Sequence, residues 1–229
     1  MNKKIMWNRT WMLWKKYASK YWWGDPLDVR FYLCSQLNTV HDKKILDVGC
    51  NVGIILNCAD DSNIKQGFDL DADSIKIAKR INKEFGLNAD FYVKDAFKSN
   101  LKKNSFDILI LSDVLPGFDY GPDKYDFDDC KRFVNKCTSY LKHGGILYLT
   151  TPNGENPYYL KKHKTKISQI RELLEKNYDF EVGHWNPLPI SLGHVLKFFP
   201  GWFCLLEFLM ARGIAKNRCI SFYVRAVKK

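Results

Sequence analysis

The feature that most constrains the fold is a regular alternation of short apolar segments with amphipathic ones, which begins at residue 44. The segments expected to form strands are 45–48, 64–69, 89–94, 106–111, 146–150, 179–185 and 220–227. Helices are expected between them over about 73–85, 126–141 and 163–177. The second of these helices is expected to end at the glycine pair that follows it. The alternation predicts an α/β fold with a doubly wound, mostly parallel, seven-stranded sheet that carries helices on both faces.

Two further helices are expected before the first strand, over residues 3–20 and 27–38. Trp7, Trp11 and Trp14 follow the spacing i, i+4, i+7, so they share one face of the first helix. At 229 residues the chain has a length typical of one α/β domain. We therefore expect a single domain with helices at its N-terminus.

The positive charge is concentrated at the two ends of the chain. The formal net charge is +11, yet residues 47–193 hold twenty basic and twenty-one acidic side chains. Five of the seven Trp residues fall within the first 23 positions. Such basic, Trp-rich flanks are candidate surfaces for an anionic partner, whether phosphate groups, anionic lipid or nucleic acid. The alternative is a set of ordinary solvated lysines around a helix that packs on the core.

Cysteine usage and the first residues indicate the compartment. Seven cysteines, an odd number without the paired spacing of a zinc ribbon, predict reduced intracellular thiols and no metal site. The start of the chain, Met-Asn-Lys-Lys, lacks the apolar core of a signal peptide. We therefore expect a cytoplasmic protein, with peripheral membrane attachment as an alternative that the basic flanks leave open.

The turn after the first strand is rich in glycine. Residues 47–53 read Asp-Val-Gly-Cys-Asn-Val-Gly. Gly49 and Gly53 let the backbone approach a ligand closely and adopt positive φ. Asn51, between them, is a residue type that tolerates the left-handed region. The spacing is not G-x-G-x-x-G, which disfavours a nicotinamide dehydrogenase.

Acidic residues end the first strands and point to a nucleoside. Asp69 ends the second strand, where its two oxygens can accept hydrogen bonds from both hydroxyls of a ribose. Asp95 ends the third strand and is placed to accept a hydrogen bond from an adenine amino group. Since ligands of doubly wound sheets bind at the carboxyl ends of the strands, these acids and the glycine turn predict a nucleoside site.

Five motifs in this order carry a family resemblance. Segment 44–153 resembles the class I S-adenosylmethionine-dependent methyltransferases, and within them the small-molecule branch that includes ubiquinone-biosynthesis-type enzymes. The motifs that resemble those of the family are Lys44–Gly53, Gly67–Asp71, Val93–Phe97, Phe106–Leu115 and Leu141–Leu147. The resemblance implies a Rossmann-like methyltransferase fold with S-adenosylmethionine as its cofactor.

By this resemblance, Asp47 and Gly49 would lie against the methionine part of the cofactor, and Asp69 would hold the ribose. Leu70 would flank the adenine, and Asp95 with Ala96 would read its edge. The remaining predicted cofactor residues are Cys50, Asn51, Gly53 and Ser112.

The pattern along the chain divides the predicted single methyltransferase domain into four parts. Residues 1–42 would form an N-terminal helical cap, and 43–185 the cofactor-binding core. Residues 186–218 would form an apolar cap insertion before the last strand, which is expected within 219–229.

Two departures from the family pattern bear on the acceptor. Where many relatives continue the fourth motif with Glu-His, this chain has Pro116-Gly117, so no acid–base role carries over to that position. Amino-group methyltransferases often place Asn/Asp-Pro-Pro-aromatic after the fourth strand, whereas this chain has Ser-Asp-Val-Leu at 112–115. The second departure disfavours exocyclic amines of bases as acceptors.

A hydroxyl acceptor would profit from a general base. His184 and His194 bracket the insertion, where caps of such enzymes cover the acceptor, and both are candidate bases. Asp113 is nearer the expected methyl position and is the third candidate. Its alternative role is to satisfy amides of its own loop.

The insertion over 186–218 is strongly apolar, but Lys197, Glu207 and a Pro-Gly pair interrupt it, so no membrane span is expected. It could form a helical cap that lines an apolar acceptor pocket. Alternatively, it could lie in the surface of a bilayer. The aromatic residues that would then enter the bilayer are Phe198, Phe199, Trp202 and Phe203.

The sequence therefore predicts methyl transfer to a small, hydrophobic or membrane-presented acceptor, at oxygen in preference to a base nitrogen. An RNA methyltransferase is an alternative that the net charge supports, although no appended RNA-binding module is visible. A non-catalytic module that only binds the cofactor is a further alternative, which the intact glycine turn and strand-end acids disfavour.

Overall fold

The computed structural model describes residues 9–18, 29–116, 126–155, 165–185 and 221–229. The insertion predicted over 186–218, His194 and the first eight residues lie outside the described residues. The division into cap, core and insertion therefore stays a prediction.

The described residues form one seven-stranded sheet in the order β3-β2-β1-β4-β5-β7-β6. Strands β1 to β5 are mutually parallel along the sheet, and β7 runs antiparallel to both of its neighbours. The strands are β1 Lys44–Val48, β2 Ile64–Asp69, β3 Ala89–Val93, β4 Phe106–Ser112, β5 Leu141–Pro152, β6 Tyr178–Trp185 and β7 Ser221–Lys228. The predicted doubly wound, mostly parallel, seven-stranded sheet is confirmed.

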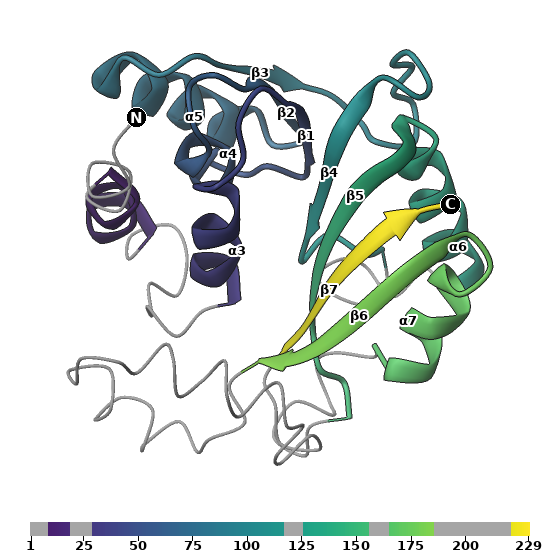
Figure 1. The fold of residues 1–229 in the computed structure, drawn as a ribbon. Coiled ribbons are helices and arrows are strands. Elements are labelled where there is room, and N and C mark those ends of the chain that lie inside the picture. Colours follow the sequence, from purple (N-terminus) through teal and green to yellow (C-terminus); the bar gives the residue numbers. More distant parts are fainter. Residues whose placement is uncertain (1–8, 19–28, 117–125, 156–164, 186–220) are drawn as a thin grey trace, which may run out of the picture.

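Helices cover both faces of this sheet (Figure 1). The helices are α3 Val29–Leu37, α4 Ile54–Cys58, α5 Ala72–Phe85, α6 Phe127–Thr138 and α7 Ile167–Leu174. On β4, Ile108 and Ile110 face the layer of α3, α4 and α5, while Leu109 and Leu111 face α6 and α7. Because successive strand residues point to opposite faces, an unbroken apolar run supplies both cores.

The caps of the longer helices follow from local sequence. The side chain of Asp71 accepts hydrogen bonds from the first backbone amides of α5, and Gly86, with φ 62°, ends that helix. Asp126 and Asp129 form a reciprocal capping box at the start of α6. These caps explain why both helices begin, and why α5 ends, close to the predicted positions.

Two local predictions differ from the structure. Helix α6 ends at Thr138 and not at a glycine, and the residues from Leu141 onward already belong to β5. The pairing shifts between Phe106–Leu141 and Ile108–Ile146, so Gly144, with φ 71°, lies in a bulge of β5 and not at a helix end. Helix α4 was not expected, because all of its five residues are buried and it has no polar face to reveal it.

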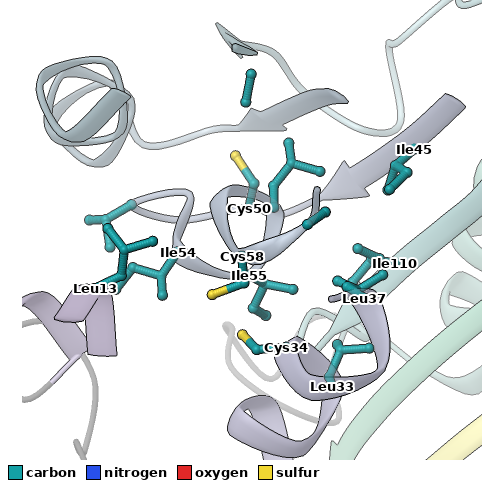
Figure 2. Close-up of a cluster of buried hydrophobic side chains, with 14 of the residues drawn as sticks. Leu13, Leu33, Cys34, Leu37, Ile45, Cys50, Ile54, Ile55, Cys58 and Ile110 are labelled. Carbon is teal, nitrogen blue, oxygen red and sulfur yellow. The ribbon is translucent and has the colours of Figure 1, made fainter. Parts of the chain in front are cut away.

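The described part of the N-terminal helix covers 9–13 and continues as a π-helix, η1 Trp14–Ala18. Its inner face is buried: the Trp14 ring packs edge-on against Phe31 of α3, with ring centroids 5.2 Å apart. Figure 2 shows the same layer, in which Leu13 lies beside Ile54 of α4, with α3 below. Trp11, expected on the same face as Trp14, is 48% exposed and still contacts Phe31 edge-on. The N-terminal helices are therefore part of the core of the fold.

Replacing Phe31 with Ala should lower the free energy of unfolding by about 3–5 kcal/mol, because it opens a cavity under the N-terminal helix. Phe31 is 1% exposed, and Trp14 and Trp11 both contact its ring. Urea unfolding followed by circular dichroism measures the change. Replacing the exposed Met12 with Ala is the control and should cost less than about 0.5 kcal/mol. A loss below about 1 kcal/mol for the Phe31 variant would contradict the packing described.

Candidate functional site

The glycine turn joins β1 to α4 in a tight left-handed path. Gly49, Asn51 and Gly53 have φ values of 74°, 48° and 74°, so the conformation expected of Asn51 is confirmed. The backbone amide of Gly49 donates to the carbonyl oxygen of Phe68 in β2 at 2.8 Å. A Cβ atom on Gly49 would lie 2.2 Å from Cγ1 of Val114, which follows β4. Glycine is required at position 49 because two chain segments approach each other there.

Asp69 is held at the end of β2 by two backbone amides. One carboxylate oxygen accepts from the amide of Asn51 at 2.8 Å and the other from the amide of Asp71 at 3.0 Å. An ionised carboxylate has about four acceptor positions, so it can accept further hydrogen bonds from a ligand. The structure thus places the predicted ribose-binding residue directly beside the glycine turn.

Asp47 is the most unusual charged group of the site. Its side chain is 1% exposed, and among the described residues neither carboxylate oxygen has a hydrogen-bond partner. Burial, with a smaller contribution from the Asp69 carboxylate, raises the pKa of Asp47 from 3.8 to about 8. An ionised carboxylate in such surroundings is stable only with a cation beside it.

Other predicted cofactor residues line the same edge of the sheet. Leu70, directly after β2, is 72% exposed, which is unusual for a large apolar side chain. The amide of Lys94 donates to the carbonyl oxygen of Asp69 at 2.9 Å, so the segment after β3 lies beside the end of β2. In that segment Asp95 accepts from the amide of Phe97 at 2.8 Å. The next residue, Ala96, packs on the hydrophobic core between the sheet and helices α6 and α7.

Cys50 and Ser112 occupy the inner part of this edge. The Cys50 thiol is buried, and burial together with the Asp47 and Asp69 carboxylates raises its pKa far above the ordinary value. Cys50 therefore forms part of the wall and is no nucleophile. The hydroxyl of Ser112, at the end of β4, lies 2.8 Å from the hydroxyl of Thr150 in β5.

Asp113 directly follows Ser112 and has a left-handed φ of 54°. One of its carboxylate oxygens accepts from the Thr150 hydroxyl at 3.1 Å, and the other lies 3.8 Å from Nη1 of Arg30 in α3. Sequence reasoning missed both partners, since nothing in a helix over 27–38 indicates where Arg30 points. The role of Asp113 as a base stays a prediction.

The structure does not bring His184 to the glycine turn. His184 lies on β6, where its ring packs edge-on against Phe222 with centroids 5.6 Å apart. Strand β6 is at the outer edge of the sheet, four positions from β1, which corresponds to roughly 19 Å. A catalytic role for His184 would require an acceptor that spans this distance. Within the described part of the chain, no cluster of His, Cys, Asp and Glu could hold a metal ion.

A family model described as a methyltransferase domain matches residues 40–188 of the chain. The chain belongs to the class I S-adenosylmethionine-dependent methyltransferases. Strand order and the strand-end site agree with this family, whose cofactor is S-adenosylmethionine. No described helix of this methyltransferase has the length and hydropathy needed to cross a membrane.

The relatives of this methyltransferase are distant. The ubiquinone biosynthesis O-methyltransferase of Coxiella burnetii is 28% identical over 133 residues, which cover 58% of this chain and 53% of the relative. The chain thus spans about half the length of that curated relative. A putative protein N5-glutamine methyltransferase of Methanocaldococcus jannaschii is 28% identical over 141 residues, covering 55% of this chain and 70% of the relative. A solved N-methyltransferase NodS from Bradyrhizobium japonicum, in complex with S-adenosylhomocysteine, is 12% identical and superposes with a TM-score of 0.64 over 97% of this chain and 98% of that one.

The residues present fit S-adenosylmethionine. Its methionine part carries an ammonium and a sulfonium, and the buried carboxylate of Asp47 calls for a cation. Gly49 and Gly53 allow the left-handed turn to pass close beneath Val114 and Phe91, and Asp69, which is predicted to hold the ribose, accepts from the amide of Asn51 in that turn. The chain therefore supplies charge, shape and hydrogen-bond acceptors that match the cofactor.

Replacing Asp47 with Asn should make the ligand-free protein more stable at pH 8 by about 2–5 kcal/mol, with little change at pH 4. Between pH 4 and 8 the unfolded chain releases this proton while the folded protein retains it, so the stability of the wild type falls as pH rises. Urea unfolding at both pH values measures the difference. Replacing the exposed Asp90 with Asn is the control. An unchanged pH slope in the Asp47 variant would contradict the assigned burial of charge.

Proposed function

We propose that this chain transfers the methyl group of S-adenosylmethionine to an oxygen of a small, hydrophobic or membrane-presented acceptor. The observation that carries the proposal is the buried Asp47 carboxylate, which lacks a partner among the described residues and adjoins the left-handed glycine turn. When bound, the cofactor supplies an electrophilic methyl group on a sulfonium. The chain's own residues hold it, align it and exclude water, since the transfer is an in-line displacement.

Asp69 orients the cofactor in this proposal. Its two hydrogen bonds from backbone amides fix the carboxylate before any ligand arrives, so little side-chain entropy is lost on binding. The exposed Leu70 beside it offers an apolar surface for the adenine. Asp47 balances the positive charge of the methionine part.

Three observations support an apolar acceptor that is methylated at an oxygen. The chain is similar to a relative named for O-methylation in ubiquinone biosynthesis. The segment 186–218, which we expect to cover the acceptor, is strongly apolar in sequence. The residues after β4 read Ser-Asp-Val-Leu, which departs from the pattern of amino-group methyltransferases. His184, His194 and Asp113 are the proposed candidates for the base.

Peripheral attachment to an anionic membrane forms part of the proposal. Trp11 and Met12 of the N-terminal helix are 48% and 54% exposed, whereas Leu13 and Trp14 beside them are buried. Arg9 and Lys16 of this helix pair with Asp61 and Glu84 of the core. The charge that would meet lipid headgroups must therefore come from other basic residues of the flanks.

An amide or amine acceptor is a second candidate, which the similarity to the putative protein N5-glutamine methyltransferase favours. RNA is a further acceptor that the net charge would suit. A labelling experiment distinguishes these acceptors from a lipidic one, because the labelled methyl group would appear in protein or RNA and not in lipid.

Isothermal titration should show that S-adenosylhomocysteine binds with a micromolar dissociation constant, about −8 kcal/mol. Replacing Asp69 with Ala should weaken binding by about 1.5–3 kcal/mol, because hydrogen bonds to a charged group are lost. Replacing the exposed Asp90 with Ala should leave the affinity unchanged. Equal affinities of wild type and the Asp69 variant would remove Asp69 from the site.

Labelled methyl donor, incubated with the protein and with total lipid, RNA, protein and small-metabolite fractions, should label an apolar acceptor in the lipid fraction. The same protein should float with anionic liposomes, and replacing both Trp11 and Met12 with Glu should reduce flotation by more than half while the dissociation constant for S-adenosylhomocysteine stays unchanged. Label in the RNA or protein fraction would contradict the lipidic acceptor. Binding of S-adenosylhomocysteine without label in any fraction would indicate a non-catalytic module.

A further inference from the structure

An ion pair joins helix α3 to the carboxyl ends of the strands, where the predicted cofactor residues lie. Arg30 lies on α3, and its Nη1 is 3.8 Å from the carboxylate of Asp113, which follows β4. The two side chains are only 16% and 12% exposed. Since the family model begins at residue 40, Arg30 lies outside the segment that defines the family.

The backbone of Asp113 has a left-handed conformation that neighbouring groups stabilise. Its left-handed φ of 54° is unfavourable for a residue with a side chain, at a cost of about 1 kcal/mol. The backbone amide of Asp113 donates to the carbonyl oxygen of Thr150 at 2.9 Å, and the Thr150 hydroxyl donates to its carboxylate at 3.1 Å. Arg30 adds the second contact to that carboxylate, so Asp113 is held from β5 and from α3.

The next residue transmits this placement to the cofactor turn. The Cγ1 atom of Val114 lies only 2.2 Å from the position that a Cβ atom on Gly49 would take, so Val114 closes directly over that glycine. Holding Asp113 therefore holds Val114, and Val114 shapes the wall of the turn at Gly49.

We propose that Arg30 is a positioning residue for the cofactor site, which acts through Asp113 and Val114 on the turn at Gly49. The inference rests on the proposed function, since it assumes that the site binds S-adenosylmethionine. It makes α3 a part of the machinery that shapes the binding site.

The chain offers a matched control for this role. Arg9 also joins an N-terminal helix to the core through an ion pair, with Asp61 at 2.6 Å, and is 14% exposed. Asp61 precedes β2, whereas Asp113 follows β4. Because these strands run parallel in one sheet, the pair of Arg9 lies at the amino ends of the strands and the pair of Arg30 at their carboxyl ends. Loss of either pair affects the attachment of the N-terminal helices, but only the pair of Arg30 lies at the ends where the predicted cofactor residues are.

The test measures the dissociation constant for S-adenosylhomocysteine by titration, at a temperature well below the melting point of every variant. Replacing Arg30 with Met should raise this constant by about fivefold to thirtyfold, which corresponds to about 1–2 kcal/mol. Replacing Arg9 with Met should change it by less than about twofold. Replacing Arg30 with Lys keeps the positive charge and should give an affinity between those of the wild type and the Met variant. If the Met variant does not fold, the Lys variant provides the test.

A double-mutant cycle tests whether Arg30 acts through Asp113. In the background of Asp113→Asn, replacing Arg30 with Met should weaken binding by less than about twofold, because the carboxylate on which it acts is gone. Equal affinities of the wild type and the Arg30→Met variant, or fully additive effects in the cycle, would overturn the inference. A wild type that does not bind S-adenosylhomocysteine would overturn the proposed function, and this inference with it.

Discussion

A buried carboxylate without a partner among the described residues is the constraint on which the site depends. Asp47 is the last residue but one of the central strand β1, is 1% exposed and lies near a second carboxylate, Asp69. Removing such a charge from water costs several kcal/mol unless a cation or a proton compensates it. In the ligand-free protein a proton compensates this charge, and the strands on both sides hold the Asp47 side chain in place for a cationic ligand.

The N-terminal helices stabilise the domain and also shape its site. Trp14 and Phe31 pack into the same core as the helix that follows the glycine turn, and Arg9 ties the first helix to Asp61. At the carboxyl ends of the strands, Arg30 holds the segment that closes over Gly49. The same helices therefore contribute packing energy at one end of the sheet and positional control at the other.

Sequence reasoning predicted the sheet, because short apolar runs are typical of strands buried on both faces and period-3.6 apolar patterns are typical of helices with one buried face. It also placed Asp69 beside the glycine turn, since strand ends converge in a parallel sheet. It misplaced the end of α6, because a glycine pair is equally compatible with a helix end and with the bulge at Gly144. The pairing of Arg30 with Asp113 depends on how a helix docks on the sheet, and 83 residues of sequence separate the two partners.

The most direct test of the account is the number of protons released when S-adenosylhomocysteine binds, measured by titration calorimetry at pH 7 in buffers of different ionisation enthalpy. With its pKa raised to about 8, ligand-free Asp47 is mostly protonated at this pH. Pairing with the ligand's ammonium ionises the group, so the wild type should release most of one proton and the Asp47→Asn variant none. Binding heats of the wild type that do not depend on the buffer would contradict the account.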